Sequence, residues 1–139
     1  MYTRDYYELL RHLMERFRLQ EEDMIFVENI ADWCRKCDIP EPDEERPFKF
    51  LSKQGYGSKM LIKEDIPDKI ISERLNALSI RGQLSSVAHD RAELLDSDEK
   101  KLTYLFLSEI AHGLFEMHDE LLADNWAFEE MGKMGFFDN

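Results

Sequence analysis

Glutamate and histidine side chains recur at helical spacing in the carboxyl-terminal half of the chain. Glu109 and His112 are three residues apart and Glu116 follows four residues later, so a helix would project all three from one side. Carboxylate oxygens and imidazole nitrogens are common ligands of divalent metals. His89 and Glu93, four residues apart on the preceding segment, are the nearest complement. The pattern predicts a divalent-metal site, and a solvated polar helix face is the alternative.

Two known families share parts of this pattern. The Glu109-x-x-His112 motif resembles half of the ferritin-like di-iron site, in which facing helices supply carboxylates and imidazoles. The dipeptides His89-Asp90 and His118-Asp119 resemble the His-Asp pair of the all-helical, metal-dependent HD-type phosphohydrolases. Each resemblance covers a single short motif, and each implies a metal-binding helical bundle.

Two cysteines follow a tryptophan in the segment Trp33-Cys34-Arg-Lys-Cys37. This string resembles the Trp-Cys-x-x-Cys motif of thioredoxin-like proteins, which implies a reactive first thiol at a helix amino terminus. The alternative places both thiols at the end of a helix as small apolar core residues.

A basic island surrounds the glycines in the middle of the chain. Its basic residues are Arg46, Lys49, Lys53, Lys59 and Lys63, and the candidate anion ligands are Lys53, Gly55, Gly57, Ser58 and Lys59. Glycine lets backbone N–H groups converge on an anion, so the island is a candidate anion or nucleotide site. In the alternative it is a flexible loop whose lysines meet the protein's own acidic faces.

A long helix, at about residues 97–122, must position the Glu-His pattern. Asp96 and Glu99 have the spacing of a capping box at its start. Apolar residues then recur at spacings of four and seven, at Leu102, Phe106, Ile110, Met117 and Leu121. That recurrence predicts one wide apolar face turned toward the core.

Shorter segments surround this helix. Apolar periodicity predicts helices over about 3–18, 21–37, 67–82 and 84–95, and a last one from Asp124. Three prolines within residues 38–47 predict a loop there. Residues 48–63 fit irregular structure or a short hairpin.

These elements predict an all-α fold, a compact bundle of five to six helices around the long helix. The length of 139 residues favours one domain over 1–139, with a possible sub-boundary in the loop 38–47.

The composition limits the classes of partner. A net charge of −12 repels phosphate backbones, so we expect no nucleic-acid partner. No apolar run approaches the length of a membrane span, and two cysteines do not suggest a secreted disulfide scaffold. A cytoplasmic protein without a membrane partner is therefore expected.

The functional hypothesis from the sequence is a small acidic protein–protein interaction or regulatory module, acting as a homodimer or an adaptor. No complete catalytic constellation supports an enzyme, and no cofactor is expected beyond a possible divalent metal. Aromatic and methionine residues near the carboxyl terminus, from Trp126 to Phe137, favour an interface when they are exposed. The metal-binding bundle and the anion-binding regulator are the two alternatives.

Overall fold

A computed structural model of the chain describes residues 1–52 and 57–137. The chain divides into two compact units, Met1–Pro67 and Asp68–Asn139. The described residues contain six α-helices and a three-stranded mixed sheet, and 56% of these residues are helical and 11% are in strands. The predicted all-α fold is therefore wrong, although helix predominates.

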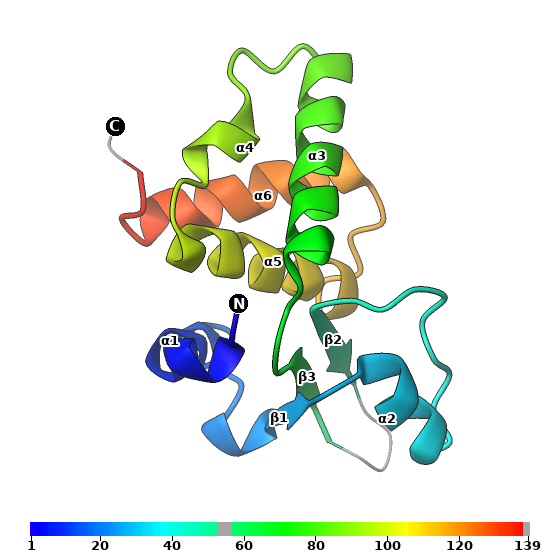
Figure 1. Ribbon diagram of the computed structural model, residues 1–139. Helices are drawn as coiled ribbons and strands as arrows, with labels where there is room; N and C mark the ends of the chain where they lie inside the picture. The colour runs from blue at the N-terminus through cyan, green and yellow to red at the C-terminus, as the bar shows by residue number, and fades with distance from the viewer. Residues whose placement is uncertain (53–56, 138–139) are drawn as a thin grey trace. The chain divides into compact units, whose positions relative to one another are not determined.

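The first unit contains the sheet (Figure 1). Its elements in chain order are the 3-10 turn η1 (Thr3–Tyr6), α1 (Tyr7–Arg16), the 3-10 turn η2 (Glu21–Asp23), β1 (Met24–Val27), α2 (Ile30–Lys36), β2 (Phe48–Leu51) and β3 (Lys59–Lys63). The strand order is β1-β3-β2, with β1 parallel and β2 antiparallel to β3. Residues 48–63 thus contribute two antiparallel strands. Of the two predictions for this segment, irregular structure or a short hairpin, the hairpin is the one observed.

The two faces of the sheet carry different helices. Side chains alternate between the faces of a strand, and Val27 and Leu61 pack with Cys34 of α2 in one apolar cluster. On the opposite face, the ring of Phe26 stacks on Tyr7 of α1 with 6.1 Å between centroids. Helices α1 and α2 therefore cover opposite faces of the sheet.

The predicted helix over 21–37 is the clearest local error. Met24–Val27 forms a strand because β3, more than thirty residues later, supplies the hydrogen-bonding partner. Only Ile30–Lys36 is helical, and Asn29 caps it by accepting a hydrogen bond from the Asp32 N–H at 2.8 Å. Aromatic and β-branched residues at helical spacing also fit a strand, so periodicity alone could not separate the two structures.

The second unit is helical. Its elements are α3 (Asp68–Leu84), α4 (Arg91–Leu94), α5 (Asp98–Gly113) and α6 (Glu120–Lys133). Nine residues of α5 are buried, so α5 forms the core of this unit. The helix predicted over 67–82 corresponds to α3, whereas the segment 84–95 is helical only in the single turn of α4.

The long helix predicted over 97–122 is two helices. Helix α5 ends at Gly113, and Glu116 adopts a left-handed backbone with φ of +54°. Asp119 then caps α6 by accepting from the N–H groups of Leu121 and Leu122 at 2.9 and 3.1 Å. The apolar periodicity crosses this break because α6 packs back against α5, so both helices bury one face in the same core.

At the start of α5, Ser97 is the capping residue, and its hydroxyl accepts from the Lys100 N–H. Asp96, the predicted cap, instead pairs with the Lys100 ammonium group at 2.8 Å.

Candidate functional site

Two of the predicted metal ligands, Glu109 and His112, belong to α5 and are surrounded by other parts of the protein. Glu109 is buried, at 6% exposure. His112 Nδ1 lies 2.6 Å from the Met117 carbonyl oxygen, and its Nε2 lies 3.2 Å from the Glu120 carboxylate. The imidazole therefore joins the last turn of α5 to the start of α6, and both its nitrogens are already in contact with oxygen atoms.

The other three predicted ligands, Glu116, His89 and Glu93, do not cluster with Glu109 and His112 in the structure. Glu116 is exposed in the turn after α5, where the helical spacing no longer applies. His89 is exposed just before α4, and Glu93 is exposed within it. Among the residues that the structure describes, no three His, Cys, Asp or Glu side chains are placed to hold a metal ion. The metal site stays a prediction.

The basic island is only partly within the structure. Lys53 and Gly55 lie outside the described residues. Gly57 has φ of +69° and Ser58 follows it. The ammonium group of Lys59, the first residue of β3, lies 3.2 Å from the Asp23 carboxylate. Lys59 thus has a counter-ion within the protein. This contact agrees with the alternative in which the lysines of this segment meet the protein's own acidic side chains.

The two cysteines occupy different environments on α2. Cys34 is fully buried in the cluster between α2 and the sheet, and burial raises the pKa of its thiol. Cys37 is exposed at the end of the helix. A nucleophilic thiol needs a lowered pKa, so the environment of Cys34 is that of a core residue.

A partly buried ion pair holds the proline-rich loop. The ammonium group of Lys63 donates to the Glu45 carboxylate at 2.8 Å and to the Glu28 carbonyl at 2.7 Å. The same carboxylate accepts from the N–H groups of Ile30 and Ala31 at 2.9 and 3.2 Å. No spacing in the sequence indicates this network, because only the pairing of β3 with β1 brings Lys63 to the start of α2.

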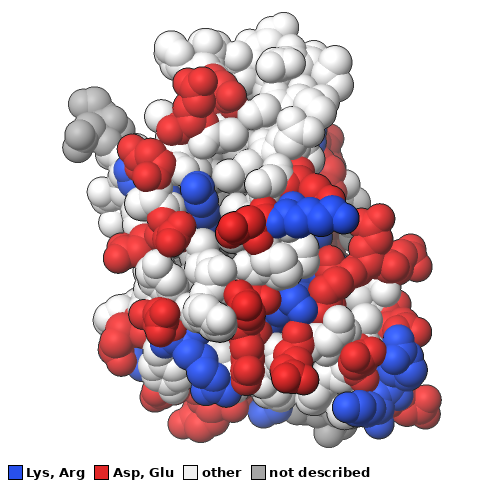
Figure 2. Space-filling model, viewed as in Figure 1, with Lys and Arg blue, Asp and Glu red and all other residues white. Residues whose placement is uncertain are grey.

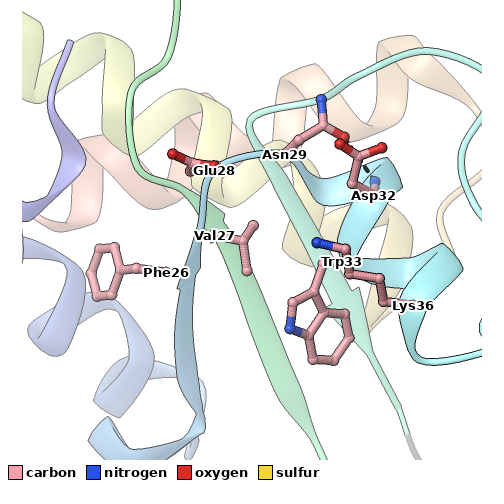
Figure 3. Close-up of a pocket in the computed structure, with 7 residues that line it drawn as sticks. All are labelled: Phe26, Val27, Glu28, Asn29, Asp32, Trp33 and Lys36. Atoms are coloured by element: carbon pink, nitrogen blue, oxygen red, sulfur yellow. Dashed lines mark hydrogen bonds between the residues drawn. The ribbon is translucent and has the colours of Figure 1, made fainter.

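A pocket of about 240 Å³ lies beside the junction of β1 and α2. Figure 3 shows Val27 of β1 pointing toward the indole of Trp33, with the Lys36 side chain beside it. The remaining lining residues are Phe26, Glu28, Asn29 and Asp32. Its volume is below the range of small-molecule sites, about 300–1,000 Å³, and suits a single amino-acid side chain.

In the second unit, a buried polar network fixes the orientation of α3. Arg81 of α3 donates to both carboxylate oxygens of Asp124 at 2.7 and 3.1 Å. The hydroxyl of Tyr104 donates to the same carboxylate at 2.7 Å. Burial, followed by the charge of Asp124, raises the pKa of Tyr104. The Arg81 side chain therefore points toward α6.

The face of α3 that points away from the buried Ile71 and Leu78 carries apolar side chains into solvent. Ile80 is 46% exposed and Leu84 is 82% exposed. They are four residues apart, so they are neighbours on the helix surface. Between residues 75 and 89 the only charged side chain is Arg81, which points to α6. Figure 2 shows this as an uncharged area over the end of α3, on a face otherwise rich in charge.

Similarity to known proteins gives no further guide. No protein-family model, no curated protein and no solved structure matches the chain. None of the helices in the described ranges is long and apolar enough to cross a membrane.

Proposed function

We propose that the protein is a non-catalytic protein-binding module, and that its second unit binds a partner on the outward face of the last two turns of α3. The observation that carries the proposal is the exposure of Ile80 and Leu84 on one helix face. A single exposed leucine needs no explanation. Two adjacent apolar side chains in a stretch whose only charged side chain, Arg81, is paired with Asp124 are unusual in a chain of which 35% is charged.

The charge of the second unit indicates the composition of the partner. Residues 68–139 contain seven basic and fifteen acidic side chains. Several of the basic side chains already have internal counter-ions, such as Lys69 with Glu73 and Lys100 with Asp96. A partner with apolar side chains flanked by lysine or arginine therefore complements this surface. A second copy of the same chain would bring like charges together.

The test uses a synthetic amphipathic helical peptide of leucine and lysine, and an otherwise identical peptide with glutamate in place of lysine. We expect the lysine peptide to bind the wild-type protein. Ile80→Ser with Leu84→Ser should weaken that binding about tenfold or more, because each buried aliphatic side chain contributes about 1.5–3 kcal/mol. Fluorescence anisotropy measures the affinity, and circular dichroism confirms that the variant is folded.

Leu122→Ser is the matched control, because Leu122 is a 59% exposed leucine on α6. Equal weakening by the control variant would contradict the proposed surface. Stronger binding of the glutamate peptide would contradict the basic partner. A wild-type dimer in sedimentation experiments that the double variant abolishes would identify a second copy as the occupant, against the basic partner.

A further inference from the structure

The outer edge of β1 has unpaired backbone groups. Among the residues that the structure describes, strand β1 has only β3 beside it in the sheet. The Glu64 N–H donates to the Val27 carbonyl at 2.8 Å, so Val27 and, two residues earlier, Ile25 turn their backbone groups toward β3. The N–H and C=O of Phe26 must then point away from the sheet. Neither has a hydrogen-bond partner in the described part of the chain.

The pocket of Figure 3 lies along this same edge. Phe26 and Val27 belong to its lining from β1, and Trp33 and Lys36 from α2. The indole N–H of Trp33 and the ammonium group of Lys36 make no hydrogen bond or ion pair with any described residue. An unpaired strand edge beside a pocket of side-chain size is the arrangement used to bind an extended peptide, where the backbone supplies affinity and the pocket selects a side chain.

We propose that an extended, basic peptide segment of a partner protein adds to the sheet as a strand beside β1. Its backbone pairs with the N–H and C=O of Phe26. One apolar side chain enters the pocket against Val27 and Trp33. This site is on the first unit and is independent of the α3 surface proposed above.

Acidic side chains bracket the edge and define the charge of the segment. Glu22 is exposed just before β1 and Glu28 just after it, whereas Asp32 beside the pocket already pairs with Arg35 at 2.8 Å. Lysine or arginine at the ends of the segment complements these carboxylates. Pairing of β1 with β1 of a second copy would place the same carboxylates opposite one another, which is destabilising. The side chain that enters the pocket meets the apolar surfaces of Val27 and Trp33, so an apolar side chain fits it.

The test uses a synthetic peptide with alternating valine and lysine, and two analogues that carry N-methyl groups at alternate positions. An N-methyl group removes a backbone donor and blocks one edge of the peptide strand. Methylation of the edge that pairs with β1 should weaken binding about tenfold or more, and methylation of the other edge should not. Hydrogen exchange followed by NMR should show the Phe26 amide protected by the unmethylated peptide and by the analogue methylated on the other edge, and not by the analogue methylated on the pairing edge.

Glu28→Lys should weaken binding of this peptide, whereas Asp43→Lys should weaken it less, because Asp43 is exposed in the loop 38–47 and does not line the pocket. Equal effects of the two variants, equal effects of the two methylation patterns or an unprotected Phe26 amide would each overturn the proposal.

The Ile80→Ser, Leu84→Ser variant should bind the peptide like the wild type. A loss of binding in that variant would show that the peptide occupies the α3 surface instead of the β1 edge.

Discussion

At the scale of single residues, environment separates side chains that the sequence treats as equivalent. Cys34 and Cys37 are three residues apart, yet one is fully buried and the other exposed. His112 has the spacing of a metal ligand, yet its ring nitrogens contact the Met117 carbonyl and the Glu120 carboxylate. Residue type and spacing define what chemistry is possible, and burial and partners decide whether it is available.

The cysteines give a prediction at this scale. Because burial raises the pKa of Cys34, its thiolate fraction at neutral pH is lower than that of an ordinary cysteine, and its sulfur is covered. We expect a colorimetric disulfide reagent to modify one thiol rapidly in the native protein and the second only on unfolding. Cys37→Ser should remove the rapid reaction, and Cys34→Ser should leave it.

Rapid reaction of both thiols, or a disulfide between Cys34 and Cys37 that forms readily under mild oxidation, would contradict this assignment. Either result would favour the thioredoxin-like interpretation of the motif.

At the scale of elements, buried polar contacts determine how the helices of the second unit are held. The Arg81, Tyr104 and Asp124 side chains come from α3, α5 and α6. Asp124 is 2% exposed, so the loss of either partner leaves a buried carboxylate with fewer donors. This network also orients the apolar outward face of α3.

The network gives a prediction of pH dependence. An unfolded tyrosine ionises near pH 10, and in the folded protein burial and the neighbouring Asp124 raise the pKa of Tyr104. Above about pH 10 the unfolded chain therefore releases a proton that the folded protein retains, so the free energy of unfolding falls as the pH rises. The contribution of Tyr104 is fully present below that pH.

Tyr104→Phe should lower the free energy of unfolding by about 1 kcal/mol at neutral pH, and this difference from the wild type should shrink above about pH 10. Urea denaturation at neutral and alkaline pH measures both effects. Tyr2→Phe is the control, because Tyr2 is 64% exposed, and it should leave the pH profile unchanged. A constant difference between wild type and Tyr104→Phe at all pH values would contradict the assignment.

At the scale of the whole molecule, the net charge of −12 opposes self-association at neutral pH. The repulsion declines as the pH approaches the isoelectric point of about 4.7, while the apolar face of α3 is unaffected. We therefore expect light scattering to show association of the wild type near that pH and monomers at neutral pH.

Ile80→Ser with Leu84→Ser should reduce this association, and Leu122→Ser should reduce it less. Circular dichroism at the same pH must show that the fold persists. Association that is equal in the wild type and in both variants would mean that the α3 surface is not what drives it.

Much of the second unit could be predicted from the sequence. The helix over 67–82 follows from Pro67 at its start and from Ile71 and Leu78 on its inner face, which the structure buries. The segment around Leu102 and Phe106 is helical and buried as its periodicity predicts. These features depend on local propensity and on one apolar face, which a sequence displays directly.

The sheet, the break before α6 and the candidate binding surfaces depend on the tertiary structure. Met24–Val27 becomes a strand only because β3 returns beside it, and a pairing between distant segments leaves no local signal. The chain turns at Glu116 because α6 packs on α5, although the apolar repeat continues through the turn. The composition fixes an acidic, charged surface. The pairing of Arg81 with the buried Asp124 and the unpaired edge at Phe26 follow from contacts between segments far apart in the chain, and these contacts decide where a partner can bind.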